Sequence, residues 1–210
     1  MNDTKIVHLI DDDAAMRDAV GLLLSTEGFS VHTYPSAPAF LKAVATNREG
    51  CVITDVRMPE MSGIELIARM KEDRIAMPVI VLTAHADVPL AVEAMKLGAV
   101  DLLEKPFEDH ALLAAVDAAF ARRSMEQSRS RETQATKDRL ASLTKRENEI
   151  LAGLLKGQSN KVIAHELGIS IRTTEVHRAN IMAKMQAGNL AALVKMVLAA
   201  SSGPEGEAQE

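Results

Sequence analysis

The sequence predicts an α/β domain with a doubly wound parallel sheet, followed by a smaller all-α domain. Over roughly the first 120 residues, short apolar runs alternate with amphipathic helical patterns, which is typical of consecutive βα units. The runs at 51–55 and 78–82 are apolar nearly throughout, as in parallel strands that are covered on both faces. After residue 142 only helical periodicity recurs, and a length of 210 residues leaves room for two domains of modest size.

The first domain is predicted to consist of five βα units. Gly28 ends the first helix, while Ser36 and Asp87 are suited to cap the second and fourth helices. Right-handed crossovers place the carboxyl ends of parallel strands at one edge of the sheet. The strands are expected at 5–10, 29–34, 51–55, 78–82 and 101–103, and the last three helices at 63–72, 88–97 and 110–122.

Polar side chains follow the predicted strands at that edge. They are Asp11, Asp12, Asp55, Thr83 and Lys105. Three clustered carboxylates repel one another unless a cation joins them. Because the set offers oxygen ligands and no His or Cys, the expected cation is Mg²⁺ or Mn²⁺. Lysine and threonine suit phosphate oxygens, and a carboxylate beside the metal can attack a phosphoryl group to form an acyl phosphate.

The acidic run at 11–13 also has a simpler interpretation. Aspartates are favoured at helix starts, because they cap the first turn and interact with the helix dipole. Capping accounts for one aspartate better than for five polar residues at the ends of separate strands. The sequence therefore favours a phosphoryl-transfer site.

Composition and charge restrict the classes of function. The single cysteine, Cys51, lies in an apolar strand, which excludes an internal disulfide framework and a cysteine-based zinc site. No apolar run approaches the roughly 20 residues that span a membrane, and no signal-peptide pattern opens the sequence, so we expect a cytoplasmic protein without a membrane partner. Residues 1–124 hold 12 Lys and Arg against 19 Asp and Glu, whereas residues 143–198 hold 8 against 4. This asymmetry suggests a cation as the partner of the first domain and a polyanion as the partner of the second.

The polar set at the sheet edge resembles that of the receiver domain of two-component response regulators, over about residues 4–120. The resemblance implies a flavodoxin-like (βα)5 fold with the strand order 2-1-3-4-5. It also implies that a histidine kinase phosphorylates Asp55, that Lys105 contacts the phosphoryl group and that Thr83 swings toward it. The motifs that carry it are Asp11-Asp12 after the first strand, Asp55 after the third, Thr83-Ala84 after the fourth and Lys105-Pro106 after the fifth.

The same resemblance implies a metal site and a cis peptide bond. Mg²⁺ would be held by Asp12, by Asp55 and by the backbone carbonyl of Arg57, with Asp11 acting mainly through water. The bond between Lys105 and the following proline is similar to one that is cis in the family.

One position departs from the family pattern. The switch residue on the fifth strand, three residues before Lys105, is often aromatic, but here it is Leu102. An aromatic toggle at this position is therefore not expected. The helix at 88–97 has apolar residues at mixed spacing, which fits either a dimerisation surface or an ordinary core face.

We divide the chain into a receiver domain at 1–122, a charged linker at 123–141 that we expect to be helical, a LuxR/NarL-type DNA-binding domain at 142–200 and a disordered acidic tail at 201–210. The linker holds few apolar residues and no Pro or Gly. That composition suits either a solvated helical extension of the preceding helix or a mobile tether.

The second domain is predicted to contain four helices. Thr144 and Glu147 form a capping-box pattern at the start of the first helix, which Gly157 ends. Asn160 begins a second helix, stopped by Gly168, and the third and fourth run to about Met185 and Ala199. The second helix is expected to turn Val162, Ile163, Ala164 and Leu167 inward. Two short helices separated by a Gly turn fit a helix-turn-helix.

The pattern from Leu143 to Met185 resembles the LuxR/NarL four-helix DNA-binding module, over about residues 140–200. The resemblance implies that 172–185 enters the major groove and that the last helix forms a dimer seam. Glu175 stands where lysine is common, and it fits either an acceptor for cytosine N4 or a partner of a neighbouring arginine. The residues expected at the DNA are Asn160, Lys161, Arg172, Thr173, Glu175, Val176, Arg178 and Lys184.

Together the two resemblances identify the chain as a phosphorylation-switched transcription regulator rather than an enzyme. The motifs Glu104–Asp109, Asp87–Lys96 and Glu175–Asn180 are similar to those of the FixJ-like regulators. That likeness implies an oxygen-sensing haem histidine kinase of the FixL type as partner and nitrogen-fixation or microaerobic genes as targets. We further expect a homodimer when the protein is phosphorylated, and RNA polymerase as a partner.

Three other functions share parts of this pattern. A FixJ-like regulator could answer a different input signal. An aspartyl-phosphate phosphatase of the haloacid-dehalogenase type expects a second aspartate two residues after the nucleophile, where this chain has Arg57. A ligand-sensing LuxR-type activator expects a large aromatic-lined pocket, which residues 1–120 do not suggest.

Overall fold

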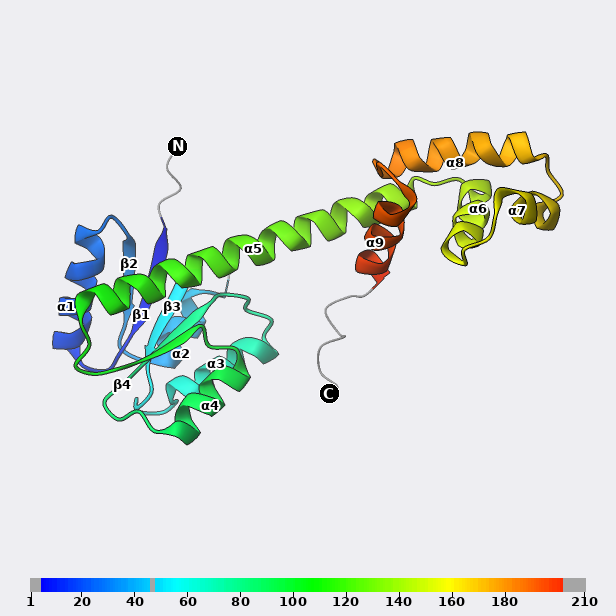
Figure 1. Ribbon diagram of the computed structural model, residues 1–210. Coiled ribbons are helices and arrows are strands. Elements are labelled where there is room, and N and C mark those ends of the chain that lie inside the picture. Colours follow the sequence, from blue (N-terminus) through cyan, green and yellow to red (C-terminus); the bar gives the residue numbers. More distant parts are fainter. Residues whose placement is uncertain (1–4, 46–47, 202–210) are drawn as a thin grey trace. The chain divides into compact units, whose positions relative to one another are not determined.

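The computed structural model describes residues 5–45 and 48–201 (Figure 1). The chain forms two compact units, unit 1 at residues 1–126 and unit 2 at residues 127–210. The boundary falls inside the segment that the sequence predicts to be a linker. The finer division at residues 122, 141 and 200 stays a prediction, and residues 202–210 lie outside the described part of the chain.

Unit 1 contains a parallel sheet of five strands among the described residues, in the order β2-β1-β3-β4-β5. This order and the alternation with helices confirm the predicted receiver-type fold. The strands are β1 (Ile6–Ile10), β2 (Ser30–Tyr34), β3 (Cys51–Asp55), β4 (Val79–Thr83) and β5 (Asp101–Glu104). The helices are α1 (Ala14–Thr26), α2 (Ala37–Ala43), α3 (Gly63–Glu72), α4 (Val88–Leu97) and α5 (Asp109–Ala141).

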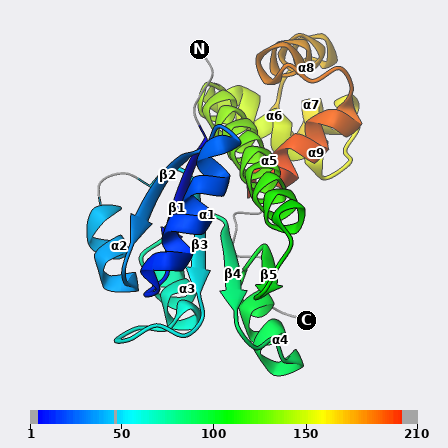
Figure 2. The same ribbon diagram turned by 90° about the vertical axis from the view of Figure 1, so that its left-hand side faces the viewer.

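Helices cover both faces of the sheet (Figure 2). Side chains of α2 and α3, such as Phe40 and Leu66, form one apolar layer with Val52 and Val81 of the sheet. Side chains of α1 and α5 form the other layer, on the opposite face. Strands β3 and β4 are buried throughout, as their unbroken apolar composition predicts.

Helix α5 continues through the predicted linker. A helix was expected over 110–122, with either a helical extension or a tether after it, and α5 is helical from Asp109 to Ala141. Its second half lacks an apolar stripe, because polar and charged residues surround it on most sides. Such a stretch is helical by propensity and side-chain pairs more than by burial.

Unit 2 is all-helical in the part of the chain that the structure describes, as predicted. Its helices are α6 (Lys145–Leu155), α7 (Asn160–Leu167), α8 (Ile171–Met185) and α9 (Leu190–Ser201), and they share a core that includes Ile150, Ile163, Ile181 and Leu193. A Cβ atom on Gly153 would lie 2.7 Å from Cγ1 of Ile163, so the close approach of α6 and α7 requires glycine there. The prediction that Val162 faces inward is wrong. Its side chain is 43% exposed, because the buried face of this short helix is too narrow to include every apolar residue of its sequence.

No single helix in the described ranges is long and apolar enough to cross a membrane. Helices α8 and α9 meet such a criterion only when they are joined across a bend of 58°. Both helices bury side chains in the core of unit 2, including Ile181 and Leu193.

Candidate functional sites

The edge of the sheet at the carboxyl ends of the strands brings three of the predicted side chains into contact. The ammonium of Lys105 donates to Oδ2 of Asp11 at 2.7 Å and to Oδ1 of Asp55 at 2.5 Å. The side chains of Asp11 and Asp55 are 2% and 10% exposed, and that of Lys105 is 16% exposed. One cation thus bridges two nearly buried carboxylates that lie 44 residues apart in sequence.

The electrostatics of this cluster follow from burial and pairing. Burial would lower the pKa of Lys105, but hydrogen bonds and charge interactions with Asp11 and Asp55 outweigh it and raise the pKa above its ordinary value. Lys105 therefore stays charged throughout the physiological range. With two carboxylates against one ammonium, the cluster keeps an excess of negative charge.

The backbone around Asp55 is held closely. The Arg57 N–H donates to Oδ2 of Asp55 at 2.6 Å, and the Gly63 N–H donates to the carbonyl oxygen of Val56 at 3.0 Å. A Cβ atom on Gly63 would lie 2.2 Å from the carbonyl oxygen of Asp55. Only glycine therefore allows α3 to start this close to the end of β3.

The acidic run after β1 divides its roles. Asp13 caps α1, since its Oδ1 accepts from the Ala15 N–H at 2.9 Å, so the capping interpretation holds for this residue. Asp11 instead faces Lys105 and Asp12 is exposed. Arg17 of α1 donates to the backbone carbonyls of Asp11 and Asp12 at 2.7 and 3.0 Å, which holds this loop against the helix.

The predicted switch residues lie on β4 and β5. Thr83 is buried, and its hydroxyl donates to the carbonyl of His85 at 3.0 Å and accepts from the His85 N–H at 3.2 Å. Glu104 accepts from the Ala86 N–H at 3.1 Å, so it holds the same loop from β5. Leu102 is half-buried and packs on the apolar layer that α4 covers. The contacts of Glu104 and Arg17 were not predicted, because a lone charged residue beside a motif gives no signal of its partners.

The donor set at the sheet edge is oxygen-only, which suits Mg²⁺ or Mn²⁺. Among the described residues, no group of three or more His, Cys, Asp and Glu side chains is placed to hold a metal. Mg²⁺ commonly uses one or two protein carboxylates and keeps several waters. The paired carboxylates of Asp11 and Asp55, beside the exposed Asp12, fit that requirement. The peptide bond between Lys105 and Pro106 is cis, as predicted.

In unit 2, serines cap the two helices of the predicted helix-turn-helix. Ser159 caps α7, and Ser170 caps α8 by accepting from the Thr173 N–H at 3.0 Å. Arg178 of α8 donates to Oδ1 of Asn160 at the start of α7, at 3.2 Å, and so ties the two helices together. The exposed side chains on these helices include Lys161, Arg172, Thr173, Glu175 and Val176.

The ammonium of Lys184 is paired within unit 2. Its ammonium donates to Oε2 of Glu147 at 2.7 Å and to the carbonyl of Ser142 at 3.3 Å. Glu147 also completes the capping box with Thr144 at the start of α6. The hydrogen bonds from Lys184 and then from the Thr144 backbone lower the pKa of Glu147. Lys184 was predicted to contact DNA, and this pairing gives it a role in the fold of unit 2.

Comparison with known proteins assigns both units. Residues 7–117 match the family described as "Response regulator receiver domain", and residues 141–197 match "Bacterial regulatory proteins, luxR family". The chain is a two-component response regulator. It is a phosphorylation-dependent regulator with a LuxR-type DNA-binding domain, and proteins of this kind pair with histidine kinases and bind DNA.

Relatives of this response regulator match along nearly its whole length. "Transcriptional regulatory protein FixJ" of Bradyrhizobium diazoefficiens is 50% identical over 92% of this chain and 95% of its own. FixJ of Rhizobium meliloti is 44% identical over 94% of this chain and 97% of its own. Among solved structures, full-length FixJ from B. japonicum is 49% identical, covers 94% of this chain and 97% of its own, and gives a TM-score of 0.59. The response regulator StyR is 40% identical, covers 93% and 98%, and gives a TM-score of 0.76.

Proposed function

We propose that Asp55 is the phosphoryl acceptor of this response regulator. The observation that carries the proposal is the buried contact in which one ammonium, that of Lys105, bridges Asp55 and Asp11. A nucleophilic carboxylate needs a neighbour that neutralises the incoming phosphoryl oxygens, and Lys105 stands at hydrogen-bond distance from Asp55. An oxygen of Asp55 attacks the phosphorus of a phosphohistidine, the N–P bond breaks, and the histidine nitrogen keeps the electron pair.

The metal of this site is proposed to be Mg²⁺ or Mn²⁺. Asp12, Asp55 and the backbone carbonyl of Arg57 would hold it, with Asp11 acting through water. When bound, the metal neutralises charge on the phosphoryl oxygens. The excess of carboxylates over ammonium groups at this edge supports the proposal.

Thr83 is proposed to carry the response away from Asp55. Its hydroxyl now bonds to His85, so contact with a phosphoryl group would require the loop after β4 to release it. Leu102 offers no aromatic ring to follow that movement. We propose that α4, whose side chains Val88, Val92 and Met95 are exposed, then supports a homodimer.

Unit 2 is proposed to bind double-stranded DNA through α7 and α8 and to regulate transcription with RNA polymerase. Exposed Lys161 and Arg172 are placed for phosphate or base contacts, and Glu175 and Val176 lie on the same exposed stretch of α8. The Thr173 N–H takes part in the cap of α8. A hydrogen bond from Arg178 to Asn160 joins α8 to α7. Phosphate contacts position the protein, while base contacts carry the sequence preference.

The pathway is proposed to be FixJ-like activation of nitrogen-fixation or microaerobic genes, with a FixL-type haem sensor as the kinase. Identities of 44–50% to three FixJ proteins support it. A different input is the alternative, and it is favoured by another relative. The "C4-dicarboxylate transport transcriptional regulatory protein DctR" of Rhodobacter capsulatus is 41% identical over 90% of this chain.

Phosphotransfer followed by footprinting tests the proposed function. We expect acetyl phosphate with Mg²⁺ to add one phosphoryl group by intact mass and to strengthen the footprint on target DNA. Phosphotransfer from histidine kinases with and without haem, each supplied with ATP, then distinguishes a FixL-type input from a different input. A footprint of the same strength with and without phosphate donor would contradict the regulatory role.

A further inference from the structure

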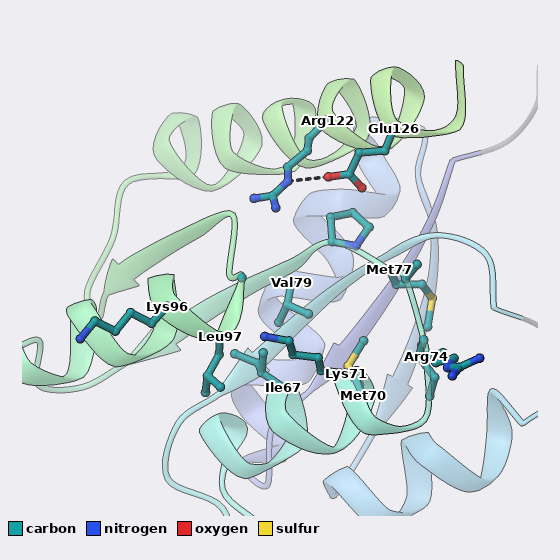
Figure 3. A pocket seen from close by; sticks show the side chains of 14 residues that line it. Ile67, Met70, Lys71, Arg74, Met77, Val79, Lys96, Leu97, Arg122 and Glu126 are labelled. Carbon is teal, nitrogen blue, oxygen red and sulfur yellow. Dashed lines mark hydrogen bonds and ion pairs between the residues drawn. The ribbon is translucent and has the colours of Figure 1, made fainter. Parts of the chain in front are cut away.

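A cavity of about 440 Å³ opens in unit 1 at the end of the sheet away from Asp55 (Figure 3). It lies between the last turns of α3 and α4, the start of β4 and a stretch of α5. Asp55 pairs with Leu82, whereas Val79, three residues earlier on β4, lines the cavity. At a rise of about 3.3 Å per residue, the cavity is roughly 10 Å from the phosphorylation edge along the strand. It is therefore a separate place on the molecule.

The floor of the cavity is aliphatic. Ile67, Met70, Met77, Val79 and Leu97 line it, and the first four are at least nine-tenths buried. No aromatic side chain lies among the lining residues, so a planar base would find no ring on which to stack. Saturated chains pack well against such Met and Ile side chains.

The walls are cationic. Lys71 extends across the apolar side chains in Figure 3, and Arg122 reaches toward them from α5. Lys96 and Arg74 stand at the flanks and direct their ends outward. The one acidic residue among the lining residues is Glu126, which accepts from Nε of Arg122 at 2.9 Å. The two terminal nitrogens of that guanidinium make no hydrogen bond or ion pair within the described chain.

Lys71 has no carboxylate partner among the described residues, although Glu72 and Asp73 follow it at the end of α3. Both acids contact Arg69 instead, at 3.5 and 2.9 Å. In a domain with an excess of acidic residues, four cations around one aliphatic hollow form a local reversal of charge. A reversal of this kind attracts anions.

We propose that this cavity binds a small amphipathic anion, a carboxylate with a saturated chain. Ligand sites in proteins typically have volumes of about 300–1,000 Å³, with an apolar lining and a few orienting polar groups, and the cavity matches this description. The chain would lie on Met70, Met77 and Val79, and the carboxylate would meet Lys71 and Arg122. A nucleic acid backbone would use the cations but leave the aliphatic floor in water, so it fits less well.

The site has a means of acting on the rest of unit 1. Its lining residues Lys96, Leu97 and Gly98 form the end of α4, and the other end of α4 follows the loop that Thr83 and Glu104 hold. A ligand that fixes one end of this helix changes the free energy of moving the other end. Binding itself requires no phosphorylation.

Methyl NMR of the full-length protein with octanoate tests the proposal. We expect saturable shifts at the methyl groups of Met70, Met77 and Ile67, and the same shifts in Asp55→Asn, which separates this test from the proposed function. Octanol, which lacks the charge, and sulfate, which lacks the chain, are expected to bind at least about tenfold more weakly, a difference of about 1.4 kcal/mol.

Charge variants locate the anion. Lys71→Gln is expected to weaken octanoate binding about two- to fivefold, as for one exposed charge contact, whereas Lys42→Gln, on α2 and away from the cavity, should leave it unchanged. Equal binding of octanol would mean nonspecific partitioning, and equal shifts with sulfate would mean an ion patch only. Either result, or the absence of saturable shifts at these methyl groups, would overturn the proposal.

Discussion

The two units each bury a carboxylate against a lysine, and they use the pair differently. In unit 2, Glu147 is 4% exposed and contacts Lys184 at 2.7 Å, one negative charge against one positive charge. In unit 1, Lys105 is shared between Asp55 and Asp11, and Asp12 adds a further negative charge beside them. The balanced pair joins parts of the fold of unit 2, whereas the unbalanced cluster carries the excess negative charge on which the proposed metal and phosphorylation site depends. The difference lies in the number of charges and not in the residue types.

The surroundings of the two pairs strengthen this contrast. One oxygen of Glu147 accepts from the Thr144 N–H, so its pairing also closes the first turn of α6. Asp55 ends a strand at an open edge, where only the Arg57 N–H and Lys105 contact its carboxylate among the described residues. The Glu147 carboxylate serves both a helix cap and an ion pair, whereas the Asp55 carboxylate, 10% exposed, lies at the sheet edge where phosphoryl transfer is proposed.

The largest expected effect separates the two carboxylates by chemistry. Asp55→Asn should reduce phosphoryl uptake from acetyl phosphate with Mg²⁺ to background, because the amide cannot act as the nucleophile. Glu147→Gln, the matched control in unit 2, should take up one phosphoryl group as the unchanged protein does. Intact mass measures both. Phosphorylation of the Asp55→Asn protein would mean that another residue is the acceptor.

Removal of each lysine tests whether Mg²⁺ can replace its positive charge. Lys105→Met leaves two facing carboxylates, so Mg²⁺ should stabilise unit 1 of this variant by about 2.7 kcal/mol at a hundredfold excess over its dissociation constant. Lys184→Met leaves Glu147 without its cation and should destabilise unit 2 by roughly 1–3 kcal/mol, with or without Mg²⁺. Hydrogen exchange read by mass spectrometry reports each unit in the full chain. Equal Mg²⁺ responses in the two units would contradict the comparison.

The contributions of the two pairs to stability should be lost at opposite ends of the pH scale. The pKa of Glu147 is lowered in the folded state, so its contribution is present above the ordinary value of 4.5 and is lost as the pH falls through the folded value. The pKa of Lys105 is raised, so its contribution is present below the ordinary value of 10.5 and is lost as the pH rises through the folded value.

Unfolding at different pH values measures these contributions. As the pH falls below about 4.5, Glu147→Gln should show a shallower loss of stability in unit 2 than the unchanged protein. As the pH rises above about 10.5, Lys105→Met should show the shallower loss in unit 1. Parallel pH profiles for each variant and the unchanged protein would mean that the pairs add no stability.

The smallest expected effect concerns DNA. Arg172→Gln should lower the slope of log affinity against log salt concentration by about 0.9, as for one lost phosphate contact. Lys184→Met should leave this slope unchanged, because Glu147 already holds its ammonium. Titrations of both proteins on one duplex at several salt concentrations measure the slopes. A lowered slope for Lys184→Met would mean that Lys184 contacts a DNA phosphate.

Much of the fold and of the phosphorylation site could be predicted from local patterns. Apolar runs ending on Asp55 and Thr83 predicted strands with their polar ends at one edge, and those ends are where β3 and β4 finish. The helix at 63–72 matches α3, since Ser62, Glu65 and Gly63 specify its start. A helical extension through 123–141 was one of two interpretations of the linker, and α5 runs to Ala141; the local pattern alone did not exclude a tether, because a polar stretch without an apolar stripe has no periodic signal.

The sequence by itself determined the order of strands and helices, the caps, the two families and the polar set that contains Asp55. Only the tertiary structure decided which charges meet. Lys105 reaches Asp11 across 94 residues and Lys184 reaches Glu147 across 37. The aliphatic cavity likewise combines α3, β4, α4 and α5. The physical reason is that hydrophobic periodicity and capping act within a few residues, whereas charge pairing and cavities depend on the distances set by packing.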